Sequence, residues 1–83
     1  MYYLYIVRCA DGTLYSGITV NIIRRITEHN TSKLGAKYTQ SRRPVKLVYT
    51  KRYRTRSSAS RAEAKLKKLP RAEKIKLISK SIK

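Results

Sequence analysis

The sequence has few of the residues on which many protein functions depend. Its 83 residues include no Trp, no Phe, one Cys, one His and only four Asp and Glu. Because Cys9 is alone, it forms no internal disulfide and no cysteine-based zinc site, which favours a reducing setting and predicts a cytoplasmic protein. A single His excludes a His-rich metal centre. Without Phe or Trp, aliphatic side chains and seven tyrosines must fill a small core.

Long hydrophobic runs are also missing. No segment approaches the roughly 18 apolar residues of a membrane-spanning helix. The apolar residues 1–7 are not preceded by a basic segment, and Arg8 and Asp11 interrupt them, so we interpret them as a strand and not as a signal peptide. No basic helix pattern has an apolar face broad enough to lie in a bilayer, and we expect no membrane partner.

Basic residues dominate the charge. Twenty-one Lys and Arg stand against four Asp and Glu, which gives a formal net charge of +17. Residues 1–50 carry eight of the basic residues and residues 51–83 carry thirteen, with two acids in each part, so the two parts have charges of +6 and +11. These charges repel one another in a folded domain, and they therefore indicate a polyanionic partner, of which nucleic acid is the commonest.

The start of the chain predicts a β-hairpin. Residues 2–8 and 13–19 are rich in tyrosine and β-branched side chains and flank an Asp-Gly pair. A two-residue loop would place Tyr5 and Tyr15 on opposite faces of the sheet. A three-residue loop, with Gly12 in the left-handed conformation, would place both on one face, and we favour this loop.

Residues 20–30 have the period of an amphipathic helix with Asn21 as its N-cap. Arg25 and His29, four residues apart, lie together along one edge of the apolar stripe. The stripe consists of Ile22, Ile23 and Ile26.

Residues 31–43 have no firm period and predict a loop or a short helix rich in cations. Pro44 then precedes a third strand, residues 45–53. Alternation predicts that three apolar side chains of this strand share one face: Val45, Leu47 and Tyr49.

Two helices complete the prediction. The first begins at the serines 57, 58 and 60, and its inward side chains are Ala59, Ala62, Leu66 and Leu69. Pro70 ends this helix and begins the second, whose inward side chains are Ala72, Ile75, Ile78 and Ile82. The order ββα-β-αα predicts an α+β fold, a small antiparallel three-stranded sheet flanked by helices, as a single domain over residues 1–83.

The few carboxylates limit the chemistry that the chain can perform. Hydrolysis of a phosphodiester needs a carboxylate for a metal ion, a group that positions or deprotonates water, and a fixed cation. Asp11 belongs to the hairpin turn, and Glu73 to the first turn of the last helix. Glu28 lies with Arg24 on the solvent-facing side of its helix, which leaves Glu63. With so few carboxylates, we expect one metal ion at most.

Two short segments carry a family resemblance. Residues 3–5 (YLY) and residues 14–17 (LYSG) resemble the two halves of the GIY-YIG endonuclease motif. Residues 36–49 are similar to the small stand-alone bacterial branch of that superfamily, which resembles the catalytic domain of a eukaryotic nuclease that cuts branched DNA. The resemblance extends over residues 1–78. It includes polar residues of the first helix: Asn21, Arg25 and His29.

The resemblance implies a role for five residues. Tyr5 and Tyr15 would hold or deprotonate the attacking water, one of them as general base. Arg25 would stabilise the charge that develops on the phosphate, and His29 would take part in proton transfer. Glu63 would hold the metal ion, Mg²⁺ or Mn²⁺. A phenol with a pKa near 10 is a poor base at pH 7 unless cations lower that pKa.

Each of these roles has a structural alternative. Tyr5 and Tyr15 could instead be core residues that pack between strands, Arg25 a solvated helix residue, and His29 a buried structural histidine. Ser60 and Glu63 have the spacing of a capping box, although a helix that begins at residue 57 or 58 would place Glu63 in its interior.

Four further residues are candidates for binding substrate. Lys37, Arg42 and Arg43 belong to the cationic segment that we expect to contact phosphates. Gly17 belongs to the motif, and its structural alternative is a close approach of the backbone.

The sequence departs from the motif at two positions. Tyr3 stands where the motif begins with Gly, and Ser16 stands where an aliphatic residue is usual. Family nucleases commonly gain target recognition from an attached module, so an unknown protein partner is one possibility for this chain.

We therefore predict a metal-dependent DNA endonuclease that acts on branched or single-stranded DNA in repair or recombination. The alternative is a non-catalytic nucleic-acid-binding domain that retains the nuclease fold.

Overall fold

A computed structural model describes residues 1–31 and 37–81. The elements along the chain are β1 (Tyr2–Arg8), β2 (Leu14–Thr19), α1 (Ile22–Thr31), α2 (Lys37–Gln40), β3 (Lys46–Tyr53), α3 (Arg56–Lys68) and α4 (Arg71–Ser81). The α+β class and the predicted element order are confirmed, and the cationic segment contains a short helix. Among these described residues, no helix is long and apolar enough to cross a membrane.

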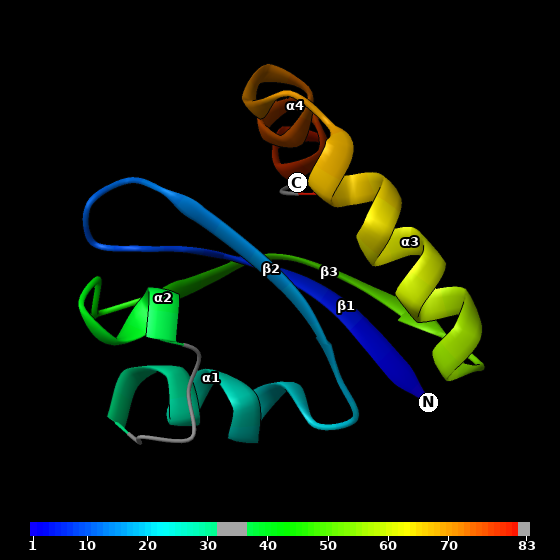
Figure 1. Cartoon of the computed structure of the whole chain (residues 1–83), viewed down its shortest axis with the longest axis horizontal. Helices are drawn as coiled ribbons and strands as arrows, with labels where there is room; N and C mark the ends of the chain where they lie inside the picture. The colour runs from blue at the N-terminus through cyan, green and yellow to red at the C-terminus, as the bar shows by residue number, and fades with distance from the viewer. Residues whose placement is uncertain (32–36, 82–83) are drawn as a thin grey trace.

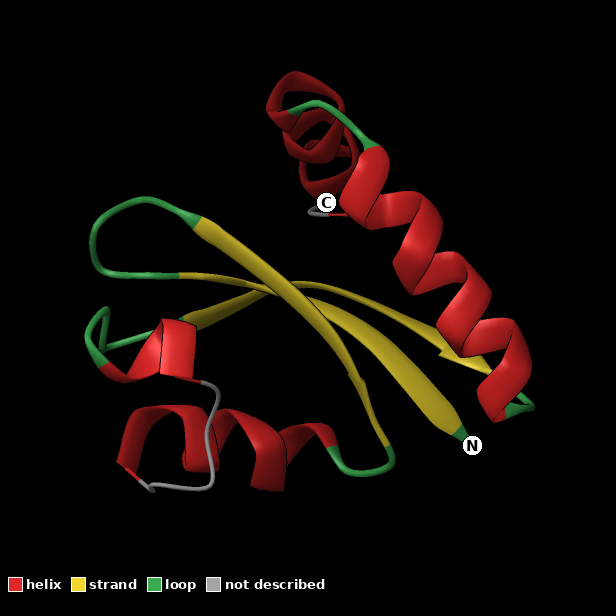
Figure 2. Cartoon of the chain, in the orientation of Figure 1, coloured by secondary structure: helices red, strands yellow, loops and turns green. Residues whose placement is uncertain are grey.

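The sheet lies between two pairs of helices. Its three strands are antiparallel in the order β2-β1-β3, so β1 is central and β2 is an edge strand. Figure 1 shows α1 and α2 on one face of the sheet and α3 and α4 on the other. The same layers are visible by colour in Figure 2, with yellow strands between red helices. Each face has its own apolar cluster, one centred on Tyr5 and Val7 and the other on Leu4 and Ile6.

The hairpin has the predicted three-residue loop. The Cys9 amide donates to the Thr13 carbonyl at 2.8 Å, and Gly12 has a φ of 85°. Tyr5 in β1 therefore pairs with Gly17 in β2, and Tyr15 in β2 pairs with Val7 in β1. This register places both tyrosines on the face that α1 covers.

The hairpin loop is held from two sides. Arg42, which precedes β3, forms an ion pair with Asp11 at 3.0 Å, and the Ala10 amide donates to the Arg42 carbonyl at 2.9 Å. Arg71 in α4 donates to the Gly12 carbonyl at 2.8 Å. Segments far apart in the sequence therefore meet at this turn.

A bulge in β3 changes the face on which its side chains lie. Val7 pairs with Leu47, whereas the preceding Ile6 pairs with Tyr49, which leaves Val48 as an extra residue. Leu47 packs on the Tyr5 side of the sheet, and Tyr49 packs on the Leu4 side. The prediction that Tyr49 shares a face with Val45 and Leu47 is wrong for this reason.

Helix α1 confirms its predicted cap but not its whole apolar stripe. The Asn21 side chain accepts from the Arg24 amide at 3.0 Å. Ile22 and Ile26 pack against the cluster, but Ile23 is 81% exposed, which corrects the prediction. The buried stripe continues from Ile22 and Ile26 to His29, which is 0% exposed. Ile22, Ile26 and His29 are four and three residues apart and share one side of the helix, so Ile23 points away from the sheet.

Helix α3 begins slightly before the predicted serines. Thr55 is the N-cap, and its hydroxyl accepts from the Ser58 amide at 3.1 Å. Glu63 therefore lies inside the helix and not in a capping box. The predicted inward stripe is confirmed, because all its members pack against the sheet: Ala59, Ala62, Leu66 and Leu69.

Helix α4 confirms only one member of its predicted inward stripe, Ile78. Leu77 and Ile78 contact the Leu4 cluster, whereas Ala72 is exposed and Ile75 is 44% exposed. The contacts of α4 with the Leu4 cluster are in its second half, whereas its first residue, Arg71, contacts the hairpin loop. Ile82 lies outside the described residues.

Candidate active site

Tyr5 is the centre of the candidate site. Its side chain is 1% exposed, and its position in β1 is directly opposite Gly17 in the edge strand β2. A Cβ atom added at Gly17 would lie 2.6 Å from the Tyr5 hydroxyl oxygen and 2.9 Å from Cζ. The phenol therefore extends across β2, and Gly17 is required because any side chain would collide with it. The close approach at Gly17 is therefore made by a side chain, and not by the backbone that we considered as its structural alternative.

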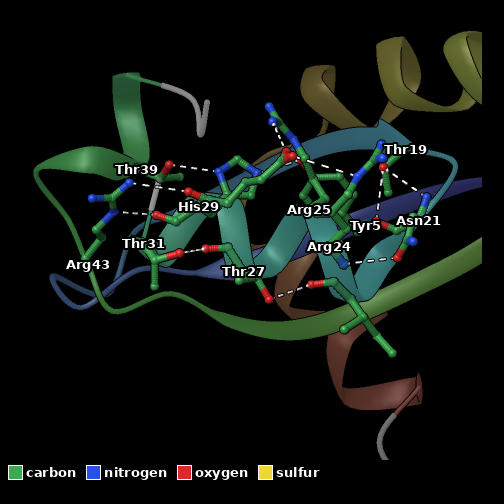
Figure 3. Close-up of polar contacts among 12 residues, drawn as sticks. Tyr5, Thr19, Asn21, Arg24, Arg25, Thr27, His29, Thr31, Thr39 and Arg43 are labelled. Carbon is green, nitrogen blue, oxygen red and sulfur yellow. Dashed lines mark hydrogen bonds and ion pairs between the residues drawn. The ribbon is translucent and has the colours of Figure 1, made fainter. Parts of the chain in front are cut away.

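His29 lies directly behind the Tyr5 hydroxyl. Its Nε2 is 2.8 Å from that oxygen, and its Nδ1 is 2.9 Å from the Thr39 hydroxyl. Both His29 and Thr39 are 0% exposed. Figure 3 shows the imidazole between Thr39 on one side and the group formed by Tyr5 and Arg25 on the other. The short helix α2 thus contributes a buried partner that the sequence did not reveal.

Burial determines the protonation states of this pair. Burial, and to a lesser extent the nearby Arg25, lower the pKa of His29 to about 4. Burial raises the pKa of Tyr5, which hydrogen bonding to Arg25 only partly offsets. At neutral pH the imidazole is therefore neutral and the phenol protonated. The Tyr5 hydroxyl then donates to Nε2, and the tautomer with a proton on Nδ1 donates to Thr39.

Arg25 extends from α1 to the Tyr5 hydroxyl and is held there by Glu28. A guanidinium nitrogen lies 3.0 Å from a Glu28 carboxylate oxygen, and hydrogen bonding links the guanidinium to the Tyr5 side chain. We had placed Glu28 with Arg24 on the solvent-facing side. Their distance is 3.8 Å, and the Glu28 side chain is only 20% exposed, so its closer partner is Arg25. Arg24 is four residues before Glu28 and Arg25 is three, and both spacings allow an ion pair on a helix.

Tyr15 belongs to a stack of rings at the edge of the site. Its ring meets His29 edge-on at 5.5 Å between centroids and stacks on Tyr38 at 5.6 Å. The Arg42 guanidinium lies 4.0 Å from the centre of the Tyr38 ring and is itself paired with Asp11. Tyr38 belongs to residues 36–49, which carry part of the family resemblance, but the resemblance gave it no role. Its stacking on Tyr15 indicates that it supports that ring.

Glu63 approaches the site from the opposite helix layer. Its carboxylate is one of the charges that raise the pKa of Tyr5, after the larger effect of burial. Lys67 lies 3.6 Å from the carboxylate, whose side chain is 23% exposed. In the part of the chain covered by residues 1–31 and 37–81, no three His, Cys, Asp or Glu side chains form a group. The single carboxylate would suit a divalent cation that takes its other ligands from water and phosphate.

The three predicted phosphate-binding cations differ in their surroundings. Lys37 is exposed at the start of α2. Arg42 is occupied by Asp11 and also donates to the Tyr38 carbonyl at 2.8 Å. Arg43 donates to the His29 carbonyl at 2.6 Å and so closes the C-terminal end of α1. Arg43 therefore supports the site from a partly buried position, whereas Arg42 links Asp11 and Tyr38 at the surface. Phosphate contact by either residue stays a prediction.

Comparison with known proteins gives consistent relatives. The chain matches the family model described as the GIY-YIG catalytic domain over residues 1–76. A UPF0213 protein of Desulfotalea psychrophila is 58% identical over 80 residues, covering 96% of this chain and 73% of the relative. A UPF0213 protein of Syntrophus aciditrophicus is 55% identical over 76 residues, covering 92% and 87%.

Two solved structures have the same fold. A solution structure of a UPF0213 protein from Bacillus halodurans is 42% identical, with a TM-score of 0.61, covering 95% of this chain and 84% of that one. A solution structure of a protein from E. faecalis is 44% identical, with a TM-score of 0.65, covering 95% and 83%.

Proposed function

The chain belongs to the GIY-YIG family of nuclease catalytic domains, and from this premise we propose that it is a DNA endonuclease that uses one divalent metal ion. The observation that carries the proposal is the group formed by Tyr5, His29 and Arg25, in which a buried phenol joins a neutral imidazole at 2.8 Å and a guanidinium. A structural tyrosine needs only one such partner. A residue that relays a proton beside a phosphate needs both an acceptor and a cation.

Tyr5 and His29 together remove the proton from the attacking water. The raised pKa of Tyr5 makes free phenolate scarce at pH 7, so the hydroxyl acts while it is still protonated. Its oxygen accepts the proton of the water as its own proton passes to Nε2 of His29. The imidazolium formed in this step keeps its Nδ1 proton, which it donates to the Thr39 hydroxyl. The water oxygen forms its bond to phosphorus as the P–O bond to the leaving oxygen breaks, and that oxygen takes up a proton from solvent. Tyr15, half-buried beside them, orients the water.

Arg25 stabilises the negative charge that accumulates on the phosphate during attack. A fixed cation contributes most when it needs no rearrangement at the moment of reaction. Glu28 holds the guanidinium at 3.0 Å, so its position is set before the substrate binds.

Glu63 would hold the metal ion. Mg²⁺ often binds proteins through one or two carboxylates and completes its shell with water and substrate phosphate, which suits a single Glu at the edge of a site. When bound, the ion would supply a positive charge for phosphate oxygens.

The substrate we propose is branched or single-stranded DNA, in repair or recombination, by likeness to the branch of the superfamily that the sequence resembles. A net charge of +17 suits recognition through phosphates, and exposed Lys37 is one contact of this kind. The exposed cations of α3 and α4 add to this field: Arg56, Arg61, Lys65, Lys67, Lys68, Arg71, Lys76 and Lys80.

The test compares Glu63→Gln with Glu73→Gln. Both variants remove one negative charge, but Glu73 lies in the first turn of α4 and is 51% exposed. Labelled flap, forked, single-stranded and duplex DNA are incubated with Mg²⁺, Mn²⁺ or EDTA. We expect metal-dependent cleavage by the wild type, loss of about 100-fold or more in Glu63→Gln, and near-normal cleavage by Glu73→Gln.

DNA binding and thermal unfolding of the same proteins complete the experiment. Glu63→Gln should bind DNA as well as the wild type. A folded wild type that binds DNA but never cuts it would support the non-catalytic binding domain instead. Equal losses in the two variants would contradict the assignment of the metal to Glu63.

A further inference from the structure

An apolar hollow lies where β1 and β2 meet the start of α1. Its volume is about 300 Å³, and its lining is Tyr3, Val20, Asn21, Ile22 and Ile23. Val20 is 55% exposed and Ile23 is 81% exposed. Isolated exposed aliphatic residues need no explanation, but here two of them surround one hollow together with a tyrosine ring. We call Tyr3, Val20 and Ile23 the apolar rim.

The apolar rim is continuous with the candidate active site. Tyr3 and Tyr5 are two residues apart in β1, so their side chains leave the same face of the strand roughly 7 Å apart. Tyr3 pairs with Thr19 as Tyr5 pairs with Gly17. In Figure 3, Thr19 and Asn21 lie next to Tyr5 and Arg25. A strand bound at Tyr5 therefore passes the rim with its neighbouring nucleotides.

The surroundings of the rim identify the kind of occupant. Arg24 follows Ile23 on the exposed surface of α1, and Arg56 lines the neighbouring hollow together with Val20. Apolar and aromatic side chains between guanidinium groups are the chemistry that binds unstacked nucleobases and their phosphates. A second copy of this chain fits poorly, because its charge of +17 would be repelled.

We propose that the apolar rim binds unpaired nucleobases next to the scissile phosphate, and that it directs the enzyme to junctions between duplex and single-stranded DNA. The inference rests on the proposed function and names the residues that select the substrate. Within a duplex the bases are stacked and paired, so the rim has no apolar surface to contact. The ring of Tyr3, which stands where the motif begins with Gly, supplies the stacking surface.

The test measures binding without cleavage. The double variant Val20→Ser/Ile23→Ser is compared with Ile75→Ser, which changes an isoleucine that is 44% exposed on the other helix layer. A third variant, Tyr3→Leu, removes the ring and keeps apolar volume. Anisotropy in EDTA gives the Kd for a labelled fork and for a fully paired duplex with the same number of nucleotides. Circular dichroism and sedimentation velocity monitor folding and oligomeric state.

We expect the double variant to weaken fork binding by about fivefold or more and to change duplex binding by less than about twofold. Ile75→Ser should change neither. A 2-aminopurine at the first unpaired position should change its fluorescence with wild type and much less with Tyr3→Leu.

Two results would overturn the inference. One is an equal change in fork and duplex binding, or no change in either. The other is a rim variant that alters only the oligomeric state, which would assign the rim to a protein interface. Binding is measured in EDTA, so it does not depend on cleavage. A wild type that binds the fork more tightly than the duplex but never cuts DNA with metal present would contradict the proposed nuclease. That result would leave the assignment of the rim intact.

Discussion

Acidification should destabilise this protein through one side chain, His29. The neutral imidazole bridges Tyr5 and Thr39, and burial lowers its pKa from 6.5 to about 4. Between pH 4 and pH 6.5, His29 is protonated in the unfolded chain but stays neutral in the folded protein. The free energy of unfolding therefore falls as the pH drops through 6.5 toward 4, and the full contribution of the neutral imidazole is present only above pH 6.5.

The size of the effect follows from the two pKa values. Integrating the difference in proton binding from pH 7 to pH 5 gives a loss of about 2 kcal/mol in the free energy of unfolding. A small domain has a total stability on the order of 5–10 kcal/mol, so the loss is a substantial part of the whole. A loss of stability between pH 7 and pH 5 can be attributed to His29. It is the one His of the sequence, and carboxyl groups ordinarily titrate at lower pH, near 4.

Urea unfolding followed by far-ultraviolet circular dichroism at pH 7, 6 and 5 measures the loss directly, at constant ionic strength because of the high charge. An NMR titration of the single imidazole gives its pKa in the same samples. His29→Gln is the control. It should be less stable than the wild type at pH 7, because buried hydrogen bonds are disturbed, and its stability should hardly change down to pH 5.

A wild type whose stability is constant from pH 7 to pH 5 would show that the imidazole is not held neutral by burial. An equal decline in His29→Gln would assign the effect to other groups. Either result would also remove the basis for a neutral His29 as the proton acceptor of Tyr5.

Two more substitutions test the positions around this network. Gly17→Ala places a Cβ atom 2.6 Å from the Tyr5 hydroxyl, so we expect displacement of the phenol and a loss of at least about tenfold in cleavage by a folded protein; unchanged cleavage would argue against Tyr5 at the reacting atoms. Asn30 exchanges hydrogen bonds of 3.1 and 2.7 Å with the backbone of Val45, so Asn30→Ala should lower the free energy of unfolding by about 2–3 kcal/mol, measured by urea unfolding; a loss no larger than that of the exposed Thr31→Ala would contradict this.

The sequence contained enough information to predict the hairpin. Gly12 marks a position that needs a left-handed conformation, and the three-residue loop sets the register that places Tyr5 opposite Gly17. Local chemistry decides such a turn, so local reasoning predicts it. The interior position of Glu63 and the cap of α1 by Asn21 were predictable for the same reason.

The parts that depend on packing between distant segments were not predictable. The bulge at Val48 arises where β3 meets β1, and simple alternation cannot reveal it. Helical period alone cannot show that His29 completes the buried stripe in place of Ile23. Thr39 becomes a partner of His29 only when α2 packs beside α1, and no sequence pattern predicts that contact.

The two-sided contacts of the hairpin loop change how this turn moves. A loop of this kind on a free hairpin opens by itself, and its amides exchange their hydrogens with water quickly. Here the Ala10 amide is bonded to Arg42, and the Gly12 carbonyl to Arg71. Opening the turn must break contacts with the segment before β3 and with α4. The turn therefore opens together with those distant segments, and we expect the Ala10 amide to exchange its hydrogen only as fast as they separate from it.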